Sequence, residues 1–147
     1  MREIKCRAKT EFSIAELDKL GVKHENGWIY GTYLDCYIVN EVVEATNEYI
    51  SLGNWFPVLE NTVGQCTGLK DKNGKEIYEG DIVKANNTNN IGCINHLIGH
   101  ACFVVKAKDN EHGLYYETLE DGLCQKYFEI ISNIYENPEL LEVDDNN

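Results

Sequence analysis

The chain has 147 residues, of which 43% are hydrophobic and 26% are charged, a composition typical of a folded protein with its own core. Its 25 acidic and 13 basic side chains give a formal net charge of −12, which repels phosphate groups and argues against general binding to nucleic acid or to an anionic membrane. No segment is apolar for long enough to predict a membrane span or a signal peptide, so we expect a cytoplasmic protein.

The first predicted element is a strand over residues 3–8, where charged and apolar residues alternate. The alternation places Cys6, which lies between two basic residues, toward the core and so predicts a structural role for this thiol. The basic residues are expected on one face of the strand, and they are Arg2, Lys5, Arg7 and Lys9. In so acidic a chain we interpret that face as solvated or as the guard of an edge strand, with nucleic-acid contact as the alternative.

Residues 13–21 predict a short amphipathic helix. Ser13 and Glu16 have the spacing of a capping box, and Gly21 is placed to end the helix. Three apolar residues share one face, and they are Ile14, Leu17 and Leu20. A helix this short is marginal alone, so its apolar face is expected to dock on the core of the same chain or, alternatively, on a neighbouring chain.

Residues 27–39 are rich in aromatic and β-branched residues and predict one or two strands bent near Gly31. The following residues 40–61 mix strand formers with breakers, and Trp55-Phe56 is expected as a short strand or a packed loop. A hydrophobic patch formed with Trp28 or Trp55 would make a contact surface. We place the boundary between two halves of the chain in this region.

Residues 62–84 contain two predicted chain reversals. An Asn73-Gly74 step allows two consecutive positive φ angles and favours a tight hairpin turn. A second reversal at 79–81 precedes a further strand. Three acidic residues of the stretch could serve an acid/base or metal site, but no histidine accompanies them and we interpret them as solvated turn residues: Glu76, Glu79 and Asp81.

The stretch 62–84 resembles the central part of the YopX family, small proteins found mainly in phages and in prophages of low-GC Gram-positive bacteria. The resemblance extends to the opening residues 1–8, to 28–31 and to the closing residues 134–140, in the same order. Two features depart from the family pattern: Cys6 replaces a usual aromatic residue, and the connection over 11–27 is longer. The resemblance implies an SH3-like barrel in the carboxy-terminal part and implies no biochemical activity.

The strand pattern agrees with that implication, because five or six short β-rich runs follow one another closely. The later runs are 91–94, 101–106, 114–118 and 129–134, and a polar loop lies at 86–90. We therefore predict a mainly β protein in which a small SH3-like barrel is packed with an amino-terminal β-rich subdomain. The predicted parts are a subdomain over 1–61 with a helix near 14–20, a barrel over 62–137, and an acidic tail over 138–147 that is partly disordered past Leu141.

The six cysteines include no Cys-x-x-Cys pair, so we expect reduced, buried residues rather than disulfides. One cluster offers four potential zinc ligands within ten residues, and they are Cys93, His96, His100 and Cys102. Its spacing fits no zinc-knuckle pattern and is better explained by two strands joined by a turn at 98–100, which leaves zinc binding as an alternative. His24 and His112 are expected to be exposed loop residues.

The sequence contains no phosphate-binding loop, nucleophile elbow, His-Glu-x-x-His helix or dinucleotide fingerprint. We therefore predict no catalytic residue and no cofactor, which favours a protein that is not an enzyme. The leading hypothesis is a phage or prophage accessory protein that forms a homo-oligomer and binds a host or phage protein. Two alternatives stay open: a zinc-binding regulator or enzyme that uses the Cys/His cluster, and an acidic mimic that occupies a host nucleic-acid-binding protein.

Overall fold

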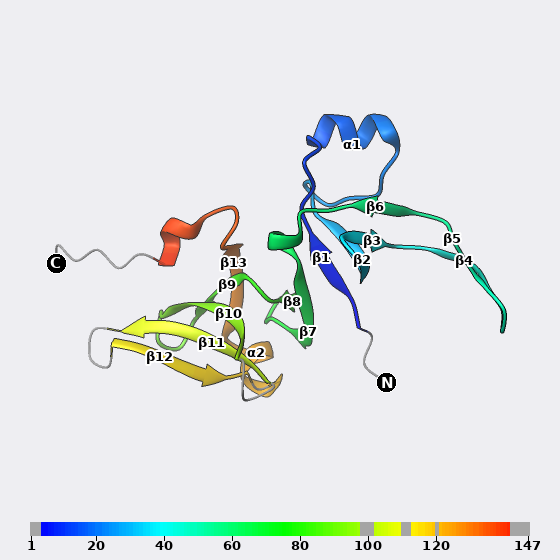
Figure 1. The fold of residues 1–147 in the computed structure, drawn as a ribbon. Coiled ribbons are helices and arrows are strands. Elements are labelled where there is room, and N and C mark those ends of the chain that lie inside the picture. Colours follow the sequence, from blue (N-terminus) through cyan, green and yellow to red (C-terminus); the bar gives the residue numbers. More distant parts are fainter. Residues whose placement is uncertain (1–3, 98–101, 110–112, 120, 142–147) are drawn as a thin grey trace. The chain divides into compact units, whose positions relative to one another are not determined.

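The computed structural model describes residues 4–97, 102–109, 113–119 and 121–141 (Figure 1). The chain divides into two compact units, Met1–Gln65 and Cys66–Asn147, which we call unit 1 and unit 2. The mainly β fold predicted from the sequence is confirmed, with antiparallel pairing between neighbouring strands of both units. No helix in the described ranges has both the length and the apolar character needed to cross a membrane.

Unit 1 is built on antiparallel strands in the order β6-β3-β2-β1-β7. Their bounds are β1 (Cys6–Ala8), β2 (Ile29–Leu34), β3 (Tyr37–Val39), β6 (Trp55–Pro57) and β7 (Gly64–Lys70), with a 3-10 turn η1 (Glu60–Thr62) before β7. The core consists of Ala8, Leu17, Ile29 and Ile38. The prediction of one or two strands over 27–39 is confirmed: β2 runs through Gly31, and β3 follows a reversal at Asp35 and Cys36, which both have positive φ. At Gly31 the pairing of β2 passes from β1 to β3, and the bend expected there stays a prediction.

The helix predicted near 14–20 is confirmed as α1 (Ile14–Leu20). The Ser13 side chain accepts a hydrogen bond from the Glu16 backbone, and Glu16 accepts one from the Ser13 backbone at 2.8 Å, so the capping box is complete. Only Leu17 of the predicted apolar face is buried, while Ile14 is 49% and Leu20 59% exposed. A two-turn helix lets its middle residue reach the core and leaves both ends at the surface.

The solvated basic face predicted for the first strand is wrong at Arg7, which is buried. The Arg7 guanidinium lies 4.7 Å from the centre of the Trp28 ring, and the Lys9 ammonium group lies 5.5 Å from it. Both cations therefore pack on the negative face of an aromatic ring, which allows a charged side chain to be buried at lower cost. Cys6, on the other face of β1, is half-buried.

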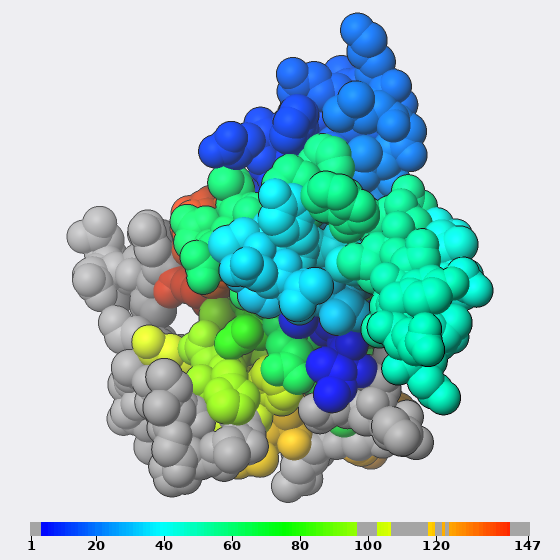
Figure 2. All heavy atoms as spheres, turned by 45° about the vertical axis from the view of Figure 1, so that its right-hand side comes forward, coloured from blue at the N-terminus to red at the C-terminus, as the bar shows by residue number. Residues whose placement is uncertain are grey.

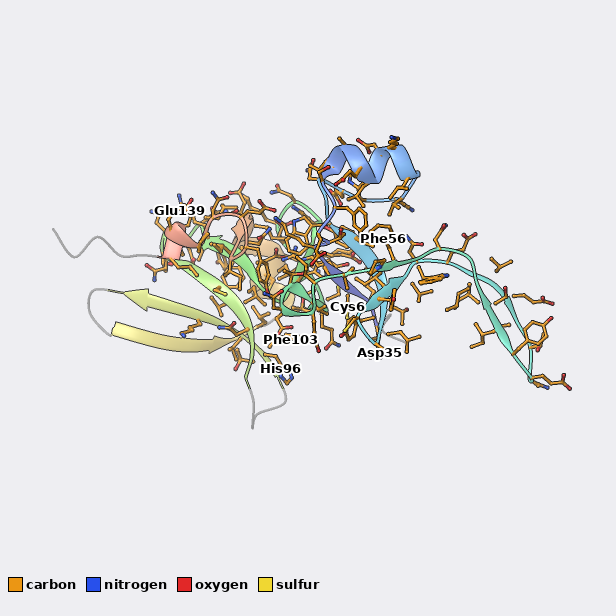
Figure 3. The ribbon with its side chains drawn as sticks, turned by 45° about the horizontal axis from the view of Figure 1, so that its top comes forward. Cys6, Asp35, Phe56, His96, Phe103 and Glu139 are labelled. Carbon is orange, nitrogen blue, oxygen red and sulfur yellow. The ribbon has the colours of Figure 1, made fainter. Side chains whose placement is uncertain are left out.

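A separate two-stranded ribbon lies between β3 and β6 in the sequence, and it consists of β4 (Val42–Ala45) and β5 (Ile50–Leu52). It continues from those strands, because the Asn40 and Gly53 backbone amides donate across the ribbon's base to Asn54 and Glu41. Figure 3 shows the ribbon leading away from β3 and β6. The register shifts at Val43, which is a β-bulge: Val42 pairs with Leu52, but the next pair is Glu44 with Ser51.

Unit 2 contains the rest of β7, its hairpin partner β8 (Glu76–Tyr78), and a five-stranded antiparallel sheet in the order β12-β11-β10-β9-β13. The bounds are β9 (Asp81–Ala85), β10 (Ile91–Leu97), β11 (Cys102–Asp109), β12 (Gly113–Thr118) and β13 (Phe128–Asn133), with a second helix α2 (Asp121–Tyr127) that the sequence did not predict. The core consists of Ile77, Val83, Ile94, Val105, Cys124 and Phe128. In the described ranges β12 and β13 stand at the two ends of the sheet, so the SH3-like barrel stays a prediction.

The chain after β13 forms a short 3-10 helix η2 (Pro138–Leu141) where the acidic tail was predicted to begin. The disorder predicted past Leu141 concerns residues outside the described part, as does the turn predicted at 98–100. The boundary between the two units falls after Gln65, inside β7, whose first residues pair with β1 and whose later residues pair with β8.

The hairpin between β7 and β8 is confirmed, but its turn differs from the predicted one. Only Gly74 has a positive φ, of 80°, so the two consecutive positive angles expected at the Asn-Gly step do not occur. Asp71 organises the turn instead: its Oδ1 accepts hydrogen bonds from the Asn73 and Lys75 amides, both at 2.9 Å. Its Oδ2 accepts a third, long-range bond at 3.1 Å from the Ile130 amide of β13. The turn is therefore fixed to the sheet through one buried carboxylate.

The reversal predicted at 79–81 is confirmed between β8 and β9, with Gly80 at a φ of 91°. Asp81 is not the solvated turn residue that the sequence suggested, because it is 1% exposed. Its Oδ2 accepts a hydrogen bond of 2.7 Å from the Tyr78 backbone amide, so the carboxylate closes the turn from inside. Glu76 and Glu79 are half-buried.

Candidate functional site

The four residues of the predicted zinc cluster are only partly placed. Cys93 and His96 both lie in β10, where a separation of three residues puts their side chains on opposite faces. Cys93 is buried, whereas His96 is exposed and its ring contacts Phe103 edge-on at 5.3 Å (Figure 3). His100 lies outside the described residues, and Cys102 is described only as backbone of β11. Zinc binding by this cluster therefore stays the alternative to a chain without a metal site.

The described cysteines differ sharply in expected reactivity. Burial raises the pKa of the Cys93 thiol from 9.0 to about 11, against the opposing effect of Lys106, so this thiol is almost entirely protonated at pH 8. Cys36 is exposed at the reversal between β2 and β3. We expect iodoacetamide to modify Cys36 in the native protein and Cys93 only after unfolding, as peptide mass mapping would report. Rapid native labelling of Cys93 would contradict this burial.

His24 is not the exposed loop residue that the sequence predicted, because its side chain is little exposed and has two hydrogen-bond partners. Its side chain is 10% exposed, and its Nε2 lies 2.7 Å from the Asp18 carboxylate at the end of α1. Its Nδ1 accepts a hydrogen bond of 3.1 Å from the Gly27 amide, so in the neutral ring the proton is on Nε2 and is donated to Asp18. The imidazole thus fixes the segment that carries Lys23 and Glu25. His112, the other predicted loop histidine, lies outside the described residues.

The ribbon has one apolar face. Residues paired across a ribbon share a face, and the bulge places Val43 together with Glu44 opposite Ser51. The other face therefore contains only apolar side chains, and they are Val42, Ala45, Ile50 and Leu52. These residues are exposed: Val42 by 56%, Ile50 by 64% and Leu52 by 38%. The turquoise atoms of this region lie on the surface in the space-filling view (Figure 2).

Two exposed aromatic residues lie close to the ribbon in the sequence, one after its base and one in its turn. Trp55 at the start of β6 is 57% exposed, and its ring contacts that of Tyr37 edge-on at 5.2 Å. Tyr49, close to the ribbon tip, is 53% exposed and donates a hydrogen bond of 2.9 Å to the Glu44 carboxylate. Of the two tryptophans proposed for a contact patch, Trp55 is therefore accessible, whereas Trp28 is buried beneath Arg7 and Lys9.

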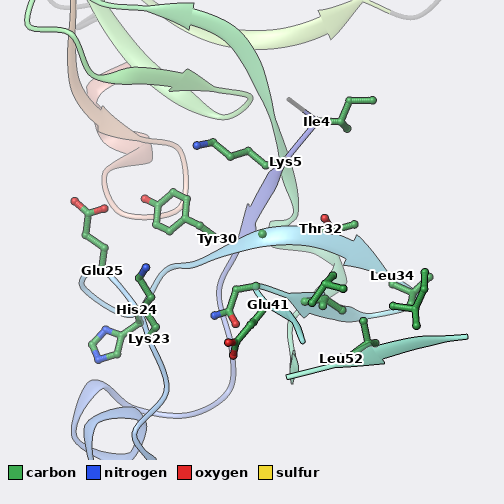
Figure 4. A pocket seen from close by; sticks show the side chains of 15 residues that line it. Ile4, Lys5, Lys23, His24, Glu25, Tyr30, Thr32, Leu34, Glu41 and Leu52 are labelled. Carbon is green, nitrogen blue, oxygen red and sulfur yellow. The ribbon is translucent and has the colours of Figure 1, made fainter. Parts of the chain in front are cut away.

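A pocket of about 730 Å³ opens at the base of the ribbon, within unit 1. Figure 4 shows its two ends: Lys23, His24, Glu25 and Tyr30 lie together at one end, and Leu34 and Leu52 lie at the other. The apolar wall includes residues of the ribbon face itself, and they are Val42, Ile50 and Leu52. The polar lining also includes Lys5, Asn40 and Glu41. The combination suits an amphipathic protein segment, because a polar and an apolar surface meet along one opening.

The distribution of charged residues in the sequence, rather than a hydrophobic period, distinguishes this region. Residues 25–65 hold six acidic and no basic residues, and the acidic ones are Glu25, Asp35, Glu41, Glu44, Glu48 and Glu60. All basic residues of unit 1 precede this stretch in the chain. The ribbon is thus acidic wherever it is charged, while the pocket at its base is lined by two lysines, Lys5 and Lys23, and by two glutamates, Glu25 and Glu41.

The comparisons with known proteins identify relatives but no activity. A solved structure described as "Crystal structure of protein EF1440 from Enterococcus faecalis" is 23% identical, and the match covers 97% of this chain and 100% of that chain with a TM-score of 0.44. No curated protein matches the chain. The family model described as YopX protein matches residues 21–142, which are 122 of the 147 residues. Because this match covers most of the sequence, the chain belongs to the YopX family.

Proposed function

We propose that this protein is a non-enzymatic accessory protein of a phage or prophage, which acts in the bacterial cytoplasm by self-association and by binding other proteins. The observation that carries the proposal is the exposed apolar face of the ribbon, defined by Val42, Ala45, Ile50 and Leu52. The phage setting is part of the proposal, and the resemblance to the YopX family supports it.

The physical argument starts from the stability of the ribbon. A two-stranded ribbon is at best marginally stable in water unless one face packs against something else. Full burial of a valine, leucine or isoleucine side chain stabilises a contact by about 1.5–3 kcal/mol, so a partner that covers this face gains stability at each apolar position. A cluster of exposed apolar residues that shares one face is therefore best explained as a surface that another protein covers.

The proposal predicts that the apolar face controls association. Replacing Val42, Ile50 and Leu52 together with threonine places a β-branched residue that suits a strand at each position but removes most of the apolar gain, and should raise the dissociation constant of the self-associated species about 100-fold or more. Sedimentation velocity across a concentration series reaching the micromolar range would measure this change. Val43→Thr, on the opposite face, is the matched control and should associate like the wild type.

Native mass spectrometry of the unmodified protein tests the proposal most directly. A metal-free oligomer supports it, and a monomer at every concentration would refute self-association. A wild-type oligomer that survives the triple threonine replacement would place the contact on another surface. Stoichiometric zinc on a monomer would instead favour the Cys/His cluster as the functional site.

A further inference from the structure

We infer that the Asn26-Gly27 step is a site of spontaneous deamidation, in which His24 acts as the base that removes the Gly27 amide proton. The product is aspartate or isoaspartate at position 26, and water is the only co-reactant. The inference concerns the segment between α1 and β2 within unit 1 and does not depend on the proposed self-association.

Asn26 and Gly27 form a tight turn just before β2. The Glu25 and Trp28 backbones exchange hydrogen bonds of 2.9 and 3.0 Å, and both turn residues have positive φ, of 52° and 87°. Asn26 is exposed, and no hydrogen bond among the described residues holds its side chain. The following residue has no side chain to block the approach, so the Asn26 amide is free to swing over the Gly27 nitrogen.

A base already faces the nitrogen that reacts. The Gly27 amide donates to His24 Nδ1 at 3.1 Å, which is within the range over which a base takes up a proton. The Asp18 carboxylate lies 2.7 Å from Nε2 of the same ring. It keeps the neutral ring protonated on Nε2 and stabilises the imidazolium that forms when Nδ1 gains a proton. A carboxylate, a base and a nucleophile are therefore joined in one chain of hydrogen bonds.

The reaction has two balanced steps. His24 Nδ1 accepts the Gly27 amide proton while the nitrogen attacks the side-chain carbonyl carbon of Asn26. The imidazolium then returns the proton to the departing NH₂ group, which leaves as ammonia, and a cyclic succinimide remains. Water opens the succinimide at either carbonyl and gives aspartate or isoaspartate. Isoaspartate adds a methylene group to the main chain, so the tight turn that leads into β2 must change.

The Asn73-Gly74 step of the same chain is an internal control. Asn73 is also exposed, and no hydrogen bond among the described residues holds its side chain. The Gly74 amide, however, donates to the Asp71 carbonyl oxygen at 3.0 Å, and a carbonyl oxygen is too weak a base to take the proton. Both steps react in one sample under one set of conditions, so the ratio of their rates reports what the neighbouring groups contribute.

The test is peptide mass mapping of the folded protein during incubation at neutral pH. We expect Asn26 to deamidate about tenfold faster than Asn73, and His24→Gln to slow the reaction at Asn26 about tenfold or more while Asn73 is unchanged. Asp18→Asn keeps an acceptor for the Nε2 proton but removes the charge, and should slow Asn26 to a smaller extent. If His24 only held the turn in place, its loss would loosen the turn and raise the rate at Asn26. The sign of the change therefore separates a base from a structural contact.

A second measurement needs no variant. In guanidinium chloride the unfolded chain removes both steps from their neighbours, so the two rates should become similar. The inference is wrong if Asn26 in the folded protein reacts no faster than Asn73, or if the preference for Asn26 persists in the unfolded chain. It is also wrong if His24→Gln leaves the rate at Asn26 unchanged or raises it.

Discussion

Gly31→Ala is expected to destabilise unit 1 by about 3 kcal/mol or more. A Cβ atom at this position would lie 2.3 Å from the Val39 carbonyl oxygen and 2.9 Å from its carbon. Both atoms belong to the backbone of β3, so no side-chain rotation relieves the overlap, and the pairing of β2 with β3 must open. Both tryptophans lie in unit 1, so urea unfolding followed by tryptophan fluorescence would report the loss.

The matched control is Gly122→Ala in α2 of unit 2, whose unfolding is followed by circular dichroism because both tryptophans lie in unit 1. A Cβ atom there meets nothing within 4 Å, and alanine favours a helix over glycine by about 0.5–1 kcal/mol, so this substitution should be neutral or stabilising. The change from glycine to alanine is thus expected to lower the free energy of unfolding at Gly31 and to leave it unchanged or raise it at Gly122. A Gly31→Ala protein with wild-type stability would show that β2 and β3 do not approach as closely as described.

Asp71→Ala is expected to destabilise the protein by about 3 kcal/mol, because one buried carboxylate accepts three backbone hydrogen bonds. Asp71→Asn should have an intermediate effect: its remaining oxygen can keep the turn bonds to Asn73 and Lys75, but its NH₂ group cannot accept from the Ile130 amide. Urea denaturation gives the stability of each variant. Hydrogen exchange at the Ile130 amide separates the loss of the long-range bond from the loss of the turn, and it should accelerate in both variants.

Lys72→Ala provides the comparison for Asp71 in the same turn. Its ammonium group lies 3.4 Å from the Glu129 carboxylate at a partly exposed position, and such pairs contribute about 0–1 kcal/mol. A Lys72→Ala effect as large as that of Asp71→Ala would mean that the turn, rather than the buried carboxylate, determines stability. Slow exchange at Ile130 in Asp71→Ala would likewise argue against the long-range bond.

The parts of the fold that the sequence predicts correctly are those fixed by neighbours in the chain. The Ser13 and Glu16 capping box closes over three residues, and the hairpin of β7 with β8 follows from a local turn. Two buried polar residues, Asp71 and Arg7, have partners that no local pattern reveals. The buried Asp71 carboxylate accepts a hydrogen bond from the amide of Ile130, 59 positions away, and the buried Arg7 guanidinium packs on the ring of Trp28. Whether a charged side chain is buried depends on residues that are distant in the sequence, so a local pattern does not reveal it.

The candidate site escaped prediction for a related reason. Strands are recognised by strict alternation, and in β4 the bulge at Val43 interrupts the period, so the apolar residues of 42–52 do not look like one face. Trp55 was correctly singled out as one of two residues for an exposed patch, but composition alone could not decide between it and Trp28. The partners of His24 were equally hidden, since Asp18 precedes it by six residues across the end of a helix.

The bulge at Val43 determines on which face of the ribbon the following side chains of β4 lie. With strict pairing beyond Val42 and Leu52, Glu44 would stand opposite Ile50, on the apolar face, and Ala45 would move to the polar one. The extra residue of the bulge shifts the pairing by one position. Ala45 therefore pairs with Ile50 on the apolar face, and Glu44 lies on the other face, opposite Ser51. Inserting or deleting one residue on either side of the tip should therefore scramble the two faces, whereas changing both strands together by two residues should only alter the length of the arm.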